Sequence, residues 1–177
     1  MELYGKTFGI YGYGSIGRQT ARIARAFGMR VLVSTRTVRP EYAADGVEFV
    51  PFADLLKESD VLSLHCPATP QTRGLIGAEA LAQMKPGAIL LNTARGALVD
   101  EAAVKAALES GHLRAAAVDV VSEEPITADN PLLTAPNCII TPHMAWAPVE
   151  SRQRLLDTVV DNIRAFLDGK PQNVVNL

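Results

Sequence analysis

Three kinds of side chain in this sequence could hold a carboxylate or move a proton: the guanidinium of Arg95, a carboxylate among Asp119, Glu123 and Glu124, and the imidazole of His143. A guanidinium group binds a carboxylate through two parallel hydrogen bonds and polarises a neighbouring carbonyl. An imidazole gives or takes a proton near neutral pH, and a carboxylate beside it stabilises its protonated form. Each of the three lies shortly after a short apolar run, where a parallel sheet would present it.

A second chemical feature is the glycine motif Gly12–Gly17, which directly follows the apolar run Phe8–Tyr11. Gly12 permits a tight turn, Gly14 lets a pyrophosphate approach the backbone, and Gly17 allows close packing of helix and strand. The helix that begins here offers unpaired N–H groups to phosphates. The motif predicts a dinucleotide site, whereas the alternative is a glycine-rich turn with no ligand.

The elements that position these residues alternate along the chain between short apolar strands and amphipathic helices. This alternation predicts an α/β fold, a doubly wound parallel sheet of the Rossmann type with helices on both faces. The predicted strands are Lys6–Tyr11, Arg30–Val33, Val47–Val50, Val61–Leu64, Ala88–Leu91, Ala115–Val118 and Cys138–Ile140, and the predicted helices are Ser15–Phe27, Phe52–Glu58, Ala78–Met84, Glu101–Leu108 and a last one from about Pro148 to Gly169.

Five sequence blocks resemble the nucleotide-binding domain of the D-2-hydroxyacid dehydrogenase family. They read GYGSIG, SDVLSLHCPATPQTRGLI, MKPGAILLNTARGALVD, AAAVDVVSEEP and ITPH, and together they span nearly the whole chain. The resemblance implies that Arg95 binds substrate, Glu124 is the catalytic glutamate and His143 is the acid/base. It also implies that Asp119 contacts the nicotinamide side of the cofactor. The family spacing selects Glu124 over the neighbouring Glu123.

Ligands of such folds bind at the carboxyl ends of the strands. The strand ends and the matched blocks together give the expected cofactor-binding residues: Gly12, Gly14, Ser15, Ile16, Gly17, Ser34, Thr35, Arg36, His65, Cys66, Pro67, Thr72, Thr93, Ala94 and Asp119.

The resemblance implies NAD(P)-dependent interconversion of a small 2-oxo acid and its D-2-hydroxy acid. Within the family, VDVVSEEPITADNPLL and ITPHMAWAP are most similar to hydroxypyruvate reductases (glycerate dehydrogenases), with hydroxypyruvate or glyoxylate as substrate. Trp146 would either narrow the substrate pocket or pack at a domain interface. The alternative function is a non-catalytic module that binds the nicotinamide nucleotide or dimerises, like corepressor relatives. Retention of Arg95, Glu124 and His143 favours the enzyme.

Cofactor selectivity is the first departure from the usual pattern. NAD-specific folds carry an acidic residue at the end of the second strand, where it bonds the ribose hydroxyls. Here Thr35 occupies that place, and Glu41 and Asp45 come later. Arg36 and Arg39 are suited to a 2′-phosphate, so the sequence favours NADP. In the alternative, Arg36 stacks on adenine and NAD still binds.

Composition narrows the class of protein. The 177 residues are 48% hydrophobic and 20% charged, which indicates a globular domain. The net charge is −2, so the electrostatic field of the whole chain does not favour binding to nucleic acid or to a membrane. Cys66 and Cys138 lack metal-ligand spacing, so no metal is expected, and they suit reduced thiols in a cytoplasmic protein. No signal peptide or membrane-spanning run is evident. The family resemblance implies a homodimer.

The second departure concerns domain organisation. Family members carry a separate substrate domain, built mostly from sequence that precedes the nucleotide domain. We therefore expect residues 1–177 to form the dinucleotide-binding domain, with the substrate domain N-terminal to Met1 and absent from this chain. Since a cleft with one wall missing neither closes nor positions substrate, the domain alone is expected to be inactive or weakly active.

Overall fold

The computed structural model describes residues 1–175, and the contacts within them divide the chain into two compact units. The first unit is Met1–Pro142, and the second begins at His143. In the described part of the chain, no helix combines the length and the apolar character needed to cross a membrane.

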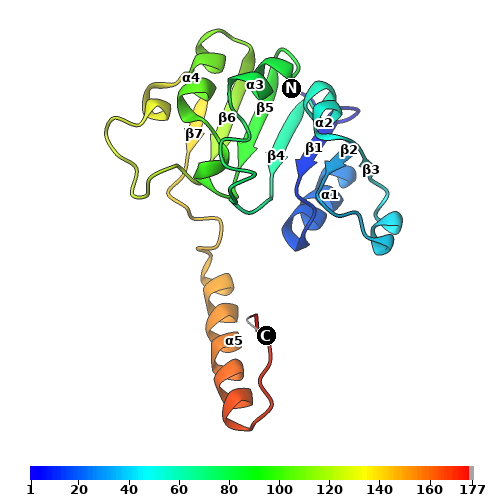
Figure 1. The fold of residues 1–177 in the computed structure, drawn as a ribbon, viewed down its shortest axis with the longest axis vertical. Helices are drawn as coiled ribbons and strands as arrows, with labels where there is room; N and C mark the ends of the chain where they lie inside the picture. The colour runs from blue at the N-terminus through cyan, green and yellow to red at the C-terminus, as the bar shows by residue number, and fades with distance from the viewer. Residues whose placement is uncertain (176–177) are drawn as a thin grey trace. The chain divides into compact units, whose positions relative to one another are not determined.

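The first unit is built on a parallel sheet. Within the described residues the sheet has seven strands in the order β3-β2-β1-β4-β5-β6-β7, so β3 and β7 are the edges (Figure 1). This arrangement confirms the predicted Rossmann-type fold. The strands are β1 (Thr7–Tyr11), β2 (Arg30–Ser34), β3 (Glu48–Phe49), β4 (Val61–Leu64), β5 (Ala88–Asn92), β6 (Leu113–Val118) and β7 (Cys138–Ile140), and the helices are α1 (Ser15–Ala26), α2 (Phe52–Glu58), α3 (Ala78–Gln83) and α4 (Glu101–Glu109).

Helices lie on both faces of this sheet. On β1, the Cβ position of Gly9 faces Leu55 of α2, whereas the neighbouring Ile10 faces Gly17 of α1. Because successive strand residues point to opposite faces, α1 and α2 cover different sides. The helix α3 packs against both α2 and α4, and the apolar residues of these three helices join one core cluster, while α1 contributes to a second cluster that contains Ile10.

The helix α1 packs against the sheet through its smallest residues. Its buried residues are small, and they let the helix axis come close to the strands: Gly17, Ala21 and Ala24. The larger apolar residues of this helix and its C-cap are 58–69% exposed: Ile16, Ile23 and Phe27.

The register of the strands aligns their carboxyl ends. Tyr11 of β1 pairs with Ser34 and Leu64, and Asn92 pairs with Leu64 and Val118. On the far side, Val118 pairs with Ile140. The residue after each of these strand ends therefore lies along one edge of the sheet, in the order Thr35, Gly12, His65, Thr93, Asp119 and Thr141.

The second unit contains α5 (Val149–Leu167), with Pro148 as its N-cap. The start agrees with the prediction, and the helix ends shortly before the predicted stop at Gly169. None of its residues is buried in the described chain, and this includes its large apolar residues: Leu155, Leu156, Val159, Val160, Ile163, Phe166 and Leu167.

Candidate active site

The turn between β1 and α1 uses its glycines for different physical reasons. Gly12 has a φ of +95°, and a Cβ there would lie 2.7 Å from the backbone nitrogen of Cys66. A Cβ on Gly17 would lie 2.4 Å from the carbonyl oxygen of Gly12. Gly12 therefore lets the turn pack against the start of the loop after β4, and Gly17 lets the first turn of α1 pack against the Gly12 carbonyl.

Gly14 is free of such constraints, which suits a ligand site. Among the described residues, no atom lies within 4 Å of the position a Cβ would take on Gly14. Gly14 is also the N-cap of α1, whose first turn has no side-chain cap and no acidic residue within the described chain. The space and the unpaired N–H groups fit a pyrophosphate. Ser15 and Ile16 are exposed beside it.

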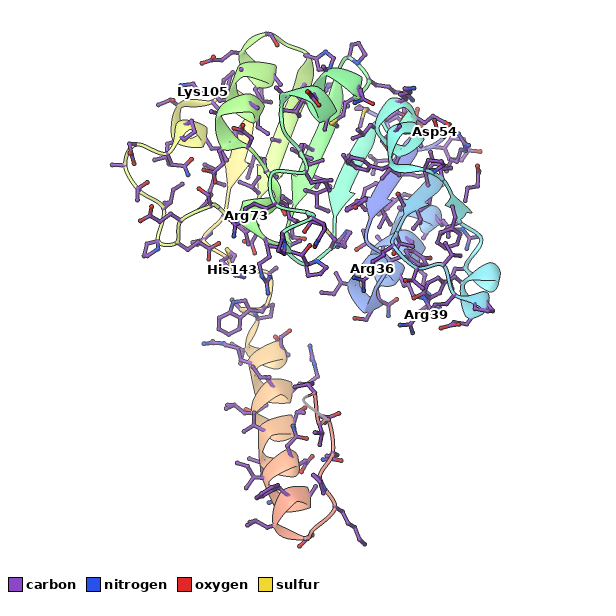
Figure 2. The ribbon with its side chains drawn as sticks, in the orientation of Figure 1. Arg36, Arg39, Asp54, Arg73, Lys105 and His143 are labelled. Atoms are coloured by element: carbon purple, nitrogen blue, oxygen red, sulfur yellow. The ribbon has the colours of Figure 1, made fainter. Side chains whose placement is uncertain are left out.

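At the end of β2, Ser34 is buried, Thr35 is half-buried and Arg36 is exposed. Within residues 1–175, the Arg36 guanidinium has no hydrogen bond or ion pair. Figure 2 shows it on the side of the sheet where the strands end. Thr35 follows the end of β2 in the aligned row, which agrees with its predicted place where an acid is expected.

Asp45, the second acidic residue after β2, forms an ion pair with Arg18. Asp45 accepts hydrogen bonds from Arg18 Nε at 2.9 Å and from Arg18 Nη2 at 3.0 Å, with a further bond from the Tyr13 hydroxyl at 3.2 Å. The bonds from Arg18 hold the pKa of the Asp45 carboxyl below its usual value. Burial, together with Asp45, raises the pKa of Tyr13 to about 12, so the Tyr13 hydroxyl stays protonated and donates a hydrogen bond to Asp45.

The loop after β4 begins with the predicted residues His65, Cys66 and Pro67. The Nε2 atom of His65 lies 2.9 Å from the hydroxyl of Ser63. Burial lowers the pKa of the His65 imidazole and raises the pKa of the Cys66 thiol, so both side chains are uncharged near neutral pH.

Thr72, another predicted cofactor residue, shapes the same loop. Its hydroxyl donates to the carbonyl oxygen of Pro67 at 2.8 Å and accepts from the backbone N–H of Thr69 at 2.8 Å. These two bonds use the side chain to close the turn. Its effect on a ligand would therefore come through the position of residues 67–69.

The loop after β5 is folded by Asn92, a buried residue outside the predicted site. Its side-chain amide donates to the carbonyl oxygen of Arg95 at 2.9 Å, and its carbonyl oxygen accepts from the backbone N–H of Ala94 at 3.0 Å. Thr93 and the Arg95 side chain are exposed, and the Arg95 guanidinium also donates to the Ala94 carbonyl oxygen at 2.6 Å. In the sequence, the signal for this loop-folding role is an asparagine directly after the apolar run of β5.

The loop after β6 carries Asp119 and Glu124. The Asp119 side chain is buried and accepts a hydrogen bond from the Thr141 hydroxyl. The Glu124 carboxylate accepts from the backbone N–H of Val121 at 3.2 Å. A Cβ on Gly96 would lie 2.0 Å from the Val121 carbonyl, so the backbone beside Arg95 packs directly on this loop.

His143 is the first residue of the second unit. It is exposed and adopts a φ of +51°, which is uncommon for a residue other than glycine. The first unit thus brings together the segments that carry Arg95 and Glu124, whereas His143 belongs to the second unit.

An open groove of about 300 Å³ lies on the α1 side of the aligned edge. Its lining includes the polar residues His65, Thr93, Asp119 and Thr141, together with apolar residues of the strands. Three of these four are predicted cofactor residues. A second groove, of about 520 Å³ between α2 and α3, contains no predicted site residue among its described lining. Within residues 1–175, no three His, Cys, Asp or Glu side chains gather as metal ligands.

Comparison with known proteins gives consistent matches. The family pattern described as "D-isomer specific 2-hydroxyacid dehydrogenase, NAD binding domain" matches residues 1–145. A hydroxypyruvate reductase of Blautia hydrogenotrophica is 51% identical over 176 residues, covering 99% of this chain and 55% of that protein. A glycerate dehydrogenase of Methylorubrum extorquens is 50% identical, covering 98% and 54%.

A solved structure matches the whole chain as well. The crystal structure of D-lactate dehydrogenase with NAD+ from Lactobacillus jensenii has a TM-score of 0.93 and 35% identity, covering 100% of this chain and 57% of that one. The chain thus spans about half the length of the relatives it matches.

Proposed function

Because the chain belongs to the D-isomer specific 2-hydroxyacid dehydrogenase family and matches its NAD-binding domain, we propose that the protein containing it interconverts a small 2-oxo acid and its D-2-hydroxy acid. Hydroxypyruvate or glyoxylate is the proposed substrate, since the most similar relatives are named hydroxypyruvate reductase, glycerate dehydrogenase and glyoxylate reductase. The observation that carries the proposal is the aligned edge, where the open Gly14 turn and the segments that carry Arg95 and Glu124 follow the ends of parallel strands.

The residues present fit a nicotinamide cofactor. The open position at Gly14 and the uncapped N-terminus of α1 would hold the pyrophosphate. His65, Thr93 and Asp119 would line the place of the nicotinamide ring in the groove. When bound, the cofactor supplies the hydride for reduction or accepts it in the reverse direction. A neutral His65 would not repel the positive charge of the oxidised ring.

The chain's own residues would bind the substrate and move the proton. The Arg95 guanidinium would hold the substrate carboxylate in a fork and polarise the adjacent carbonyl. His143 would donate a proton to the oxygen that becomes the hydroxyl, and would take it back in oxidation. Glu124 would favour the protonated form of His143. The roles of the last pair rest on the family resemblance.

We propose NADP as the preferred cofactor. Two acidic residues follow β2, and both are paired with arginines. Asp45 bonds Arg18, and Glu41 Oε1 lies 3.7 Å from Arg39 Nη1. Neither carboxylate is then available for the ribose hydroxyls, which supports NADP. Arg36 is then the exposed cation next to the expected ribose position. If Arg36 instead stacked on adenine, NAD would bind equally well.

We further propose that residues 1–177 form the dinucleotide-binding domain of a cytoplasmic homodimer whose substrate domain comes from preceding sequence. Two free cysteines, one of them buried, support a reducing compartment. Light scattering on the full-length protein tests the dimer, and a monomeric mass contradicts it.

The function is tested by turnover of hydroxypyruvate and glyoxylate with NADPH and NADH, measured on the full-length protein. We expect reduction of at least one of the two acids, and loss of kcat together with a raised KM in Arg95→Ala. Arg95→Lys should restore less than wild-type activity because an ammonium group lacks the fork. Arg114→Ala, an exposed arginine near the start of β6, is the matched control.

A second outcome would favour the alternative function. Tight cofactor binding without turnover of either acid in the full-length protein would indicate a non-catalytic nucleotide-binding module.

A further inference from the structure

Glu101, in the first turn of α4, makes three hydrogen bonds to a distant loop. Its carboxylate accepts from the backbone N–H of Ser122 at 2.7 Å, from the Ser122 hydroxyl at 2.7 Å and from the side-chain amide of Asn130 at 2.9 Å. These partners lie 21 and 29 residues further along the chain. The bonds tie α4 to both ends of the loop that carries Glu124.

Helix capping does not account for these bonds. The N-cap of α4 is Asp100, whose carboxylate accepts from the backbone N–H of Ala103 at 3.0 Å. The carboxylate of Glu101 is therefore available for the loop, and it is favourably placed near the positive end of the helix dipole. Three donors converge on its two oxygens, which is a charge-assisted arrangement.

The peptide that Glu101 holds is also the one against which the Arg95 segment packs. A Cβ on Gly96 would lie 2.0 Å from the Val121 carbonyl carbon and oxygen and 2.5 Å from the Ser122 nitrogen. That nitrogen is the atom bonded to Glu101. The Val121–Ser122 peptide thus packs against the backbone of Gly96 and is also bonded by the Glu101 carboxylate.

The same stretch also bonds Glu124. The backbone N–H of Val121, which belongs to the preceding peptide group, donates to Glu124 Oε1 at 3.2 Å. A shift of that peptide would therefore move Glu124 relative to Arg95. Displacements of about 1 Å at reacting groups cost up to roughly 100-fold in rate.

We propose that Glu101 is a positioning residue that fixes the Arg95 segment and the Glu124 segment in register for the reaction. This role rests on the proposed function. Glu101 touches neither the substrate nor the cofactor site, and it acts through the Val121–Ser122 peptide. Its loss would leave the Gly14 turn, on another loop of the sheet, in place.

The test compares Glu101→Ala, Ser122→Ala and the double variant in the full-length protein, with Glu109→Ala on the same helix as the control. Glu101→Ala should lower kcat/KM for the 2-oxo acid about 10- to 100-fold. The Kd for the cofactor should stay within about twofold, because the phosphate site lies on the loop after β1. The double variant should fall no further than Glu101→Ala, since the two residues act on the same peptide.

Two further readouts separate positioning from general stability. If His143 must be protonated for reduction, kcat/KM should fall as the pH rises. This fall should begin at lower pH in Glu101→Ala, as it should in Glu124→Gln, because both changes weaken the effect of the Glu124 carboxylate on His143. Hydrogen exchange at the Ser122 amide should accelerate, whereas exchange in β1 should not. Glu101→Gln should be intermediate, because its amide nitrogen cannot accept one of the bonds that the carboxylate accepts.

The outcomes are distinct. If the wild-type protein turns over 2-oxo acids and Glu101→Ala keeps its kcat/KM and pH profile, the positioning role is wrong and the proposed function stands. Additive losses in the double variant would also overturn the role. If the wild-type protein turns over no 2-oxo acid, the proposed function and the role that rests on it both fail.

Discussion

The guanidinium of Arg18 donates to both carboxylate oxygens of Asp45, at 2.9 and 3.0 Å, across 27 residues of sequence. This pair ties the segment after β2 to the helix that follows the glycine turn. Because the Asp45 side chain is only 9% exposed, its charge is committed to Arg18. The exposed charge nearest the end of β2 is then the guanidinium of Arg36.

Arg36→Ala should reduce the preference for NADPH over NADH. A hydrogen bond to a charged group contributes roughly 1.5–3 kcal/mol, so the ratio of the two dissociation constants should change at least several-fold. Fluorescence titration of both cofactors measures it. Arg22→Ala, in which the removed arginine bonds Gln19 at 3.1 Å, is the control. Equal affinities for NADPH and NADH in the wild-type protein, unchanged in Arg36→Ala, would indicate relaxed selectivity.

Gly14→Val should weaken cofactor binding without unfolding the domain. No described atom lies within 4 Å of the new Cβ, so the protein accommodates it, whereas the same space is needed by the phosphates. We expect an affinity loss of roughly 10-fold or more, measured by titration, with little change in Tm.

Two other glycines serve as comparisons for that variant. Gly12→Ala should lower Tm, because its φ of +95° and the 2.7 Å approach to the Cys66 nitrogen strain any side chain. Gly77→Ala, at the N-cap of α3, should leave binding unchanged. Wild-type affinity in a folded Gly14→Val variant would disprove the phosphate site.

Under the proposed function, His143 and Glu124 should act as one acid–base unit in the full-length protein. Reduction needs a protonated imidazole, so kcat/KM for reduction should fall as the pH rises. Glu124→Gln removes the charge that stabilises the imidazolium, and the decline should begin at lower pH. His143→Ala should lower kcat/KM for reduction about 10²- to 10⁴-fold. Steady-state kinetics across the pH range measures both effects.

The neighbouring Glu123 provides the control for this pair. It is exposed, and Glu123→Gln should leave the pH profile in place. If Glu124→Gln leaves the profile where it was, Glu124 is not coupled to His143. A shift in Glu123→Gln instead would mean that the assigned carboxylate is wrong.

Burial lowers the pKa of His65, so this residue should make stability depend on pH. In the unfolded chain a histidine takes up its proton as the pH falls through about 6.5, whereas folded His65 stays neutral to lower pH. The unfolded state then binds more protons, and the free energy of unfolding should decline below pH 6.5. His65→Gln should flatten this part of the curve in denaturant titrations. An NMR titration midpoint at or above 6.5 would contradict the prediction.

The sequence predicted the elements that define the site because their signals are local. Each predicted strand is present, and the glycines directly after β1 form the turn that the motif indicates. The positions of Thr35, His65 and Asp119 along one edge followed from the carboxyl ends of parallel strands. Their alignment needed no knowledge of side-chain contacts.

What the sequence did not predict depends on contacts between distant segments. Ile16 is apolar, yet the helix packs through the smaller Gly17 because the small residue permits a closer approach to the sheet. The bonds of Glu101 to the loop after β6 join segments that are unrelated in sequence. The hydroxyl of Thr72 closes its own turn, a use that residue type alone does not distinguish from ligand contact.

The order of the strands has an energetic consequence for how such a protein can diversify. β2, which ends next to Thr35 and Arg36, is separated from β5, which leads to Arg95, by β1 and β4. At about 4.8 Å per strand, these two ends lie roughly 14 Å apart, beyond the range at which substitutions usually couple. The free-energy effects of Arg36→Ala and Arg95→Ala should then add. Substitutions at Thr35 and Arg36 that change the preference between NADP and NAD should therefore leave the contribution of Arg95 unchanged.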